Sequence, residues 1–197
     1  MKKLFLIVIP LFLLSFMSEE STHLAKVENV LGVPMFVFSE PTTEYDVIGK
    51  AMSFNDMMKM TLDEQSSVRE KSEKIVEQTQ KRVKKNKIED FDALLIRIEN
   101  DKVLAIKFKS EKTDKAQLTD VFDVPVYFFN QPEESYNIVK ELEADYSKSA
   151  KNGLLFDRIN SMVKRTLKKL KNKEVESFDA IIINPDDLSE KLIVYKK

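Results

Sequence analysis

The chain has 197 residues, of which 43% are apolar and 33% are charged, a composition that suits one or two folded domains and excludes an extended disordered chain. Its 32 basic and 33 acidic side chains nearly cancel, so net charge indicates neither nucleic acid nor an acidic membrane surface as a partner. Cysteine is absent, which excludes disulfides, thiolate metal ligands, a cysteine nucleophile and a lipidated cysteine.

The N-terminal residues have the pattern of an export signal. Two lysines precede an apolar run over residues 4–17, and two glutamates follow it. The run is shorter than the ~20 apolar residues that cross a bilayer. Residues 1–21 are therefore predicted to be a cleaved signal peptide, with an uncleaved anchor as the alternative. We expect an exported protein, periplasmic or extracellular, that is not a lipoprotein.

Most of the remaining sequence occurs twice. Residues 33–48, VPMFVFSEPTTEYDVI, return as residues 124–139, VPVYFFNQPEESYNIV, at an offset of 91. Residues 91–96, FDALLI, return as residues 178–183, FDAIII, at an offset of 87, so the second copy is shorter. A repeat of this length predicts a tandem domain duplication rather than a solenoid unit.

Each copy is predicted to begin with two strands. The first strand of each copy is predicted at residues 33–38 and 124–129, which are rich in β-branched and aromatic residues and are each followed by a proline. Alternation of apolar and polar residues predicts the second, near 45–51 and 136–144. Within residues 136–144 of the second copy, helix propensity is high after residue 139, but the alternation and the repeat favour a strand. The residues expected on its buried face are Tyr136, Ile138, Leu142 and Ala144.

A long helix and two further strands complete each copy. The first helix is predicted from Thr61, which has capping-box spacing to Glu64, to Asn86, and the second over 152–172. The closing strands are placed at 91–98 and 102–109, and at 178–183 and 192–196.

These elements predict an α+β fold with two tandem β-β-α-β-β repeats, each a small, mainly antiparallel sheet with one long helix on a face. The first repeat covers residues 22–110 and the second 120–197. The polar, lysine-rich residues 111–119 are predicted to be a linker.

This order of elements resembles the YbjQ-like, heavy-metal-binding-like fold and the related RcsF-like envelope domains. The residues that carry the resemblance are Tyr45, Val47, Ile48, Gly49, Phe91, Asp92 and Ala93, echoed by Tyr136, Ile138, Phe178, Asp179 and Ala180. The resemblance implies an α/β envelope domain and transfers no catalytic residue. The chain departs from the pattern at Lys140, which stands where the first copy has Gly49, and it lacks the cysteines of RcsF-like proteins.

Several kinds of site can be excluded from residue counts. His23 is the single histidine, so a histidine triad or a zinc site with several imidazoles would depend on a residue beside the export signal, and we interpret it as a tail residue. The three glycines, Gly32, Gly49 and Gly153, form no phosphate-binding loop.

Repeated polar residues are the next candidates. Asp92 and Asp179 occupy equivalent positions, where each carboxylate is expected to accept hydrogen bonds from nearby backbone amides. An acid site that pairs these carboxylates in an enzyme is the alternative. Tyr45 and Tyr136 also recur, and we interpret them as scaffold.

Methionines gather at one place in the first copy. Met52, Met57, Met58 and Met60 could bind Cu(I), because thioether sulfur selects this ion. Methionine equally fills irregular gaps or forms an adaptable surface. The basic helix ends at 81–85 and 164–171 match the helix dipole and are interpreted as solvated faces.

The sequence therefore predicts an exported, non-catalytic binding or structural module whose partner is a protein or another envelope component. No nucleic acid partner, no stable membrane insertion after signal cleavage and no cofactor other than Cu(I) are expected. The alternatives are an enzyme with a carboxylate-based acid site and a methionine-mediated Cu(I) binder. Function is expected where the copies differ, at residues 52–60 or between the two units.

Overall fold

The computed structural model describes residues 23–53, 67–97, 102–143 and 155–196, which form an α+β protein, as predicted. Along the first half lie β1 (Leu24–Val27), β2 (Asn29–Val30), β3 (Val33–Val37), β4 (Ser39–Pro41), β5 (Tyr45–Ser53), α2 (Val68–Lys84), β6 (Ala93–Arg97) and β7 (Lys102–Phe108). Along the second lie β8 (Lys115–Leu118), β9 (Val126–Phe128), β10 (Asn130–Pro132), β11 (Tyr136–Leu142), α3 (Leu155–Lys171), β12 (Ala180–Ile183) and β13 (Glu190–Tyr195).

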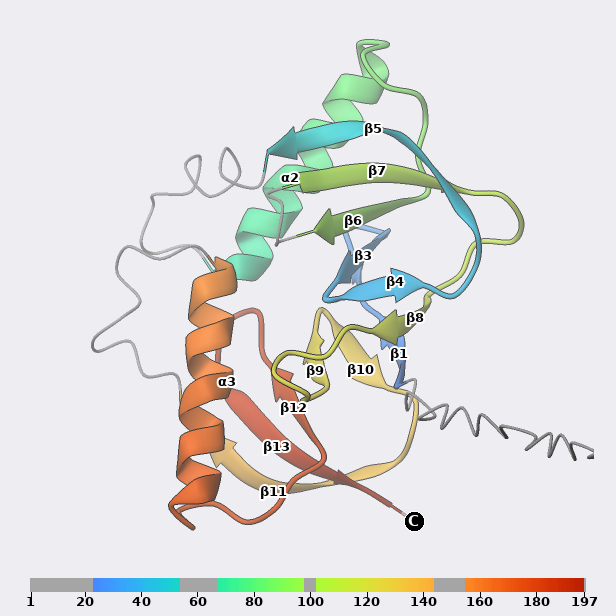
Figure 1. Ribbon diagram of the computed structural model, residues 1–197. Coiled ribbons are helices and arrows are strands. Elements are labelled where there is room, and N and C mark those ends of the chain that lie inside the picture. Colours follow the sequence, from blue (N-terminus) through green and yellow to red (C-terminus); the bar gives the residue numbers. More distant parts are fainter. Residues whose placement is uncertain (1–22, 54–66, 98–101, 144–154, 197) are drawn as a thin grey trace, which may run out of the picture.

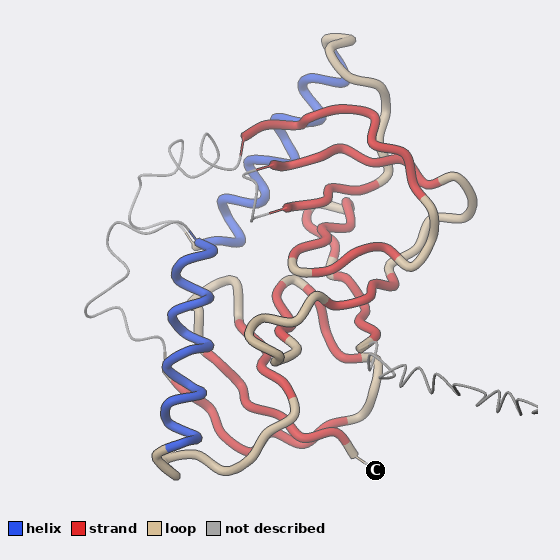
Figure 2. Tube along the Cα trace, in the orientation of Figure 1, coloured by secondary structure: helices blue, strands red, loops and turns tan. Residues whose placement is uncertain are grey.

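Two outer sheets carry the helices. The sheet of the first half has the strand order β2-β3-β6-β7-β5, and that of the second has the order β11-β13-β12-β9. Only the pairs β3–β6 and β9–β12 are parallel, so both sheets are mainly antiparallel, as predicted. Figure 1 shows the two sheets above and below a third one. In Figure 2 the two helices follow each other along one side of the molecule.

The third sheet joins the two halves. Its order is β10-β1-β8-β4, so each half lends a strand to the other: β4 pairs with β8, and β10 pairs with β1. At its centre Ala25 on β1 lies opposite Ala116 on β8, and these two alanines are 91 positions apart, the offset of the repeated sequence. The two halves are therefore tied by backbone hydrogen bonds in both directions.

Strand β8 falls within residues 111–119, which the polar composition predicted as a linker, so that prediction is wrong there. Lys115 and Gln117 are exposed, whereas Ala116 and Leu118 are buried. Because only one face of this short strand is covered, half of its residues are polar, and four residues are too few for the alternation to be distinctive.

The short strands β4 and β10 were also not predicted. Each follows a phenylalanine with positive φ, Phe38 at 51° and Phe129 at 60°. This left-handed residue ends the preceding strand and turns the chain from the outer sheet into the central one. The predicted β-β-α-β-β order therefore lacks the strands that connect the halves.

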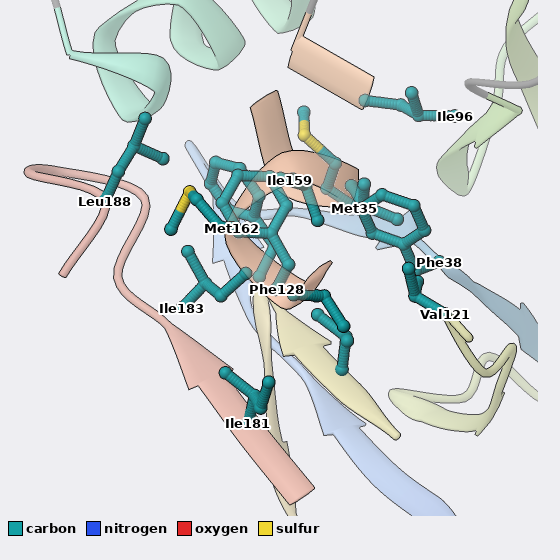
Figure 3. Packing of buried hydrophobic residues seen from close by; sticks show 14 of the residues in the cluster. Met35, Phe38, Ile96, Val121, Phe128, Ile159, Met162, Ile181, Ile183 and Leu188 are labelled. Atoms are coloured by element: carbon teal, nitrogen blue, oxygen red, sulfur yellow. The ribbon is translucent and has the colours of Figure 1, made fainter. Parts of the chain in front are cut away.

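One hydrophobic core serves both halves. Its fully buried members come from both halves, from β3, β5, β6, β7 and α2 of the first and from β9, α3, β12 and β13 of the second, and they include Met35, Leu94, Phe128, Ile159 and Ile181. Figure 3 shows side chains from β3, β6, β9, α3 and β12 pointing at one another. The halves consequently cannot be separate domains with independent cores.

Helix α2 begins later than predicted. Ser67 is its N-cap, with extended φ/ψ of −64° and 164°, and forms a capping box with Glu70. The predicted start at Thr61 is therefore wrong for this helix, and Thr61 and Glu64 themselves lie outside the described residues. Both helices end at a left-handed residue, Asn86 and Lys173.

A bulge in β5 and β11 changes which residues face inward. The register shifts between Val47 and Gly49, and again between Ile138 and Lys140. Ile138, before the bulge, is 46% exposed, whereas Val139 at the bulge packs on the core. The prediction that Tyr136, Ile138 and Leu142 share one buried face is wrong, because the bulge adds one residue and turns Leu142 to the other face.

Candidate functional site

The two repeated aspartates bind backbone in separate sheets. Asp92 accepts a hydrogen bond from the amide of Phe108 at 3.0 Å, and Asp179 accepts one from the amide of Tyr195 at 2.9 Å. Each thus fixes the end of the last strand of its own sheet, which is the structural role expected from the sequence. Asp92 also pairs with Lys112 at 2.8 Å. Partial burial favours a higher pKa for Asp92, but Lys112 and the Phe108 amide outweigh it and hold the pKa below its usual value.

The methionine candidates can be placed only in part. Met52 lies on β5 opposite Val103 and packs on the shared core. Met57, Met58 and Met60 lie outside the described residues. Within the described ranges, no group of three His, Asp or Glu side chains gathers closely enough to hold a metal ion.

His23 and the basic helix ends have structural contacts. The His23 ring stacks on Tyr195, with centroids 5.6 Å apart, so it is packed rather than a free tail residue. In the last turn of α2, Arg82 donates to the carbonyl oxygen of Ala51. Lys164 on α3 lies 4.7 Å from the centroid of the Phe122 ring.

A polar pocket of about 210 Å³ opens where β4, β6 and the end of β8 meet. It is lined by Phe38, Ser39, Glu40, Leu95, Ile96, Arg97 and Thr119. The kink at Phe38 creates it, because β4 leaves the outer sheet there while β6 continues to Arg97. It is smaller than the ~300–1,000 Å³ of drug-sized sites and holds several times the ~30 Å³ of one water molecule.

Three side chains form a hydrogen-bonded cluster at this pocket. Nη2 of Arg97 donates to Oε1 of Glu40 at 3.1 Å and to the hydroxyl of Tyr45 at 3.2 Å. The Tyr45 hydroxyl in turn donates to Oε2 of Glu40 at 2.5 Å. Glu40 raises the pKa of Arg97, which stays cationic, and burial together with Glu40 raises the pKa of Tyr45.

The second half contains the counterpart of this pocket. By the offsets of the repeated sequence, the counterparts of Phe38, Glu40 and Arg97 are Phe129, Gln131 and Asn184, and the counterpart of Thr119 is Glu28. The backbone hydrogen bonds at the two sites correspond. The Thr119 amide donates to the carbonyl oxygen of Phe38 at 2.8 Å, and the Glu28 amide donates to the carbonyl oxygen of Phe129 at 2.9 Å.

The counterpart is filled by the chain itself. Arg69, from the first turn of α2, places its guanidinium 5.5 Å from the centroid of the Phe129 ring. It donates to Glu28 at 2.9 Å and to both oxygens of Asp186 at 3.0 and 3.1 Å. Gln131 donates to the other oxygen of Glu28 at 3.1 Å. Arg69 is therefore a built-in occupant of the second-half pocket.

A buried carboxylate lies apart from both pockets. Glu190 on β13 is 1% exposed, accepts a 2.7 Å hydrogen bond from Thr166 and pairs with Arg165 at 3.3 Å. Burial raises its pKa, and the two partners offset part of that rise. In the first half the counterpart of Glu190 is Val103, so this carboxylate is not part of the repeated pattern.

Sequence reasoning placed the site at other residues and missed the pocket. Glu40, Arg97 and Thr119 stand at positions where the two copies differ, which is the signal that could have found them. Tyr45, a candidate from the sequence, does belong to the pocket cluster, whereas Tyr136 packs with Tyr195 in the second half.

Among the described residues, the α+β fold thus places an open pocket beside Arg97 in the first half and the side chain of Arg69 in its counterpart in the second half. No family model, curated protein or solved structure matches this chain. The resemblance to the YbjQ-like fold thus stays a prediction. None of the described helices is long and apolar enough to span a membrane.

Proposed function

We propose that this chain is an exported, non-catalytic binding module and that the pocket beside Arg97 holds its ligand. The observation that carries the proposal is the contrast between the two recesses. In the second half the side chain of Arg69 occupies the recess, through its contact with Phe129 and its hydrogen bond to Glu28. The pocket of about 210 Å³ in the first half is open.

A tandem duplication explains why two such recesses exist. Its support lies in the sequence offsets and in the central sheet, where Ala25 pairs with Ala116. Ser39 and Asn130, again 91 positions apart, also approach each other, with Asn130 Nδ2 3.5 Å from Ser39 Oγ. Contacts between equivalent positions are expected on a pseudo-two-fold axis. After duplication one recess could keep a ligand while the other gained an internal occupant.

Export is proposed from the sequence of residues 1–21, a basic pair followed by a short apolar run. The absence of cysteine from the whole chain is compatible with an oxidising compartment. The carboxylate enzyme is less well supported, because Asp92 and Asp179 are each engaged by the backbone of a different sheet.

The binding function is tested by NMR titration of the ¹⁵N-labelled protein with small polar acids, amides, amines and alcohols. Shift changes are expected at the amides of Ser39, Ile96 and Thr119, and not at their counterparts in the filled recess. Thr119→Trp should abolish these changes, because the indole occupies the pocket. Asp120→Trp adds the same ring at the neighbouring position, which does not line the pocket, and should leave them intact. Shift changes for none of the compounds, or changes that Thr119→Trp leaves unaltered, would overturn the proposal.

A further inference from the structure

The guanidinium of Arg97 has an unused donor at the pocket. Its Nη2 serves Glu40 and Tyr45, whereas its Nε is buried and has no hydrogen-bond partner among the described residues. A buried N–H without an acceptor is unfavourable, because it has lost its hydrogen bonds to water. The Nε is not accessible from the pocket, so the Arg97 donors that an entering acceptor can meet are those of Nη1, for which the described residues supply no partner.

The open pocket also differs in charge from the filled one. At the position of Thr119 the filled recess has the acid Glu28, and at the position of Arg97 it has the neutral Asn184. The filled recess binds a guanidinium through Glu28 and Asp186. In the open pocket Arg97 stands in place of Asn184, and Thr119 stands in place of Glu28. A second guanidinium would therefore meet repulsion from Arg97 instead of attraction from Glu28.

Glu40, the acid among the residues that line the pocket, is already engaged. Both of its oxygens accept hydrogen bonds, one from Arg97 and one from Tyr45. Glu40 and the guanidinium of Arg97 pair at 3.1 Å, and this ion pair partly compensates both charges. The polar groups that remain for an incoming molecule are consequently the Nη1 of Arg97 and the hydroxyl of Thr119.

We propose that the pocket beside Arg97 takes a carboxylate, an inference that rests on the binding function proposed above. The planar guanidinium matches a carboxylate better than any other common anionic group except phosphate, and charge-assisted hydrogen bonds are stronger than neutral ones. The volume of about 210 Å³ admits a group between acetate and an amino acid in size. Such a carboxylate belongs either to a small organic acid or to the end of a polypeptide.

Three small probes of similar shape and different charge test the chemistry. Sodium acetate, acetamide and methylguanidinium chloride are titrated into the labelled full chain at constant ionic strength. Acetate is expected to shift the amides of Ser39, Ile96 and Thr119, with acetamide at least about tenfold weaker. Methylguanidinium should not compete with acetate. Equal binding of acetate and acetamide would overturn the inference.

Variants that carry the residues of the filled recess test the chemistry of the pocket, and their thermal midpoints show whether they remain folded. Arg97→Asn should weaken acetate binding by about tenfold or more. Arg97→Asn combined with Thr119→Glu should bind methylguanidinium in preference to acetate. Arg82→Asn, the matched control, makes the same substitution at an arginine that does not line the pocket and should retain acetate binding. Unchanged acetate affinity in Arg97→Asn, with an unchanged thermal midpoint, would contradict the proposal.

A final titration distinguishes a small organic acid from a polypeptide C-terminus as the source of the carboxylate. N-acetyl-diglycine with a free C-terminus is compared with its C-terminal amide and with acetate. Tighter binding of the free peptide than of acetate indicates a polypeptide end, and equal binding indicates a small acid. If amides or amines bind at these residues and acetate does not, the carboxylate inference fails while the binding function stands. If no probe binds there, both fail.

Discussion

Replacing Phe128 by alanine should lower the free energy of unfolding by about 3–5 kcal/mol. Phe128 on β9 is 0% exposed, and its ring packs edge-on against Phe38, 6.4 Å away, and against Phe129, 5.0 Å away. The loss includes the transfer of the ring to water and the cavity left among residues of both halves. Because the core is shared, urea unfolding should shift as one transition, whichever half is followed.

Phe122→Ala is the matched control for this substitution. The same change of side chain occurs in the same half, but Phe122 is 44% exposed and contacts Lys164 through its ring face. Its loss should cost less than about 1 kcal/mol. Similar losses in the two variants, or a transition that splits in Phe128→Ala, would contradict a shared core.

Thr166→Val should destabilise the protein by about 1.5–3 kcal/mol, the range for a hydrogen bond to a charged group. The hydroxyl of Thr166 donates to the buried Glu190 at 2.7 Å, and valine has the same shape without the donor. Thr79 is the counterpart on α2, equally buried, but its hydroxyl donates to the carbonyl of Ile75 in its own helix at 2.8 Å. Thr79→Val should therefore change stability by less than about 0.5 kcal/mol. Chemical denaturation of both variants at pH 7 is the measurement.

The cost of Thr166→Val should depend on pH. Burial raises the pKa of Glu190 above its ordinary value of 4.5, so the stability linked to Glu190 is complete below that value and is lost as the pH rises through its folded pKa. Thr166 lowers that pKa, and removing its hydroxyl raises it further. The variant should therefore lose more stability relative to the wild type at pH 7 than at pH 4. A cost that is equal at both pH values would show that Glu190 is not charged in the native protein.

The outer sheets and helices could be predicted because their residues follow clear periods. The runs around Val37 and Val126 are continuous and apolar, since both faces of these strands are covered, and the stripe through Ile75, Val76 and Thr79 marks the buried side of α2. The repeat further supported the assignment of β11 as a strand against its helix propensity.

The central sheet could not be predicted, because its strands carry little local signal. Strands β4 and β10 have three residues each, and β8 has four. Their partners lie in the other half of the chain, as Ser39 opposite Leu118 illustrates. Pairing over such a distance depends on the positive φ of Phe38 and Phe129, which no propensity of phenylalanine indicates.

The pocket was missed for a related reason. It is bounded by residues from β4, β6 and the end of β8, which meet only when the central sheet forms. The sequence comparison emphasised what the copies share, and shared residues such as Asp92 and Asp179 proved to fix strand ends. Arg97 and Thr119 differ from their counterparts, and such differences point to function once the fold places them together.

We infer that the two halves, joined by the pairing of β1 with β8, fold as one cooperative unit. Native-state amide hydrogen exchange in increasing urea tests this unit most directly. The amides of Leu95 on β6 and Ile182 on β12 should show the same free energy of opening, because both outer sheets unfold with the shared core. Different opening free energies for the two sheets, with different dependence on urea, would show two independent domains and contradict the shared unit.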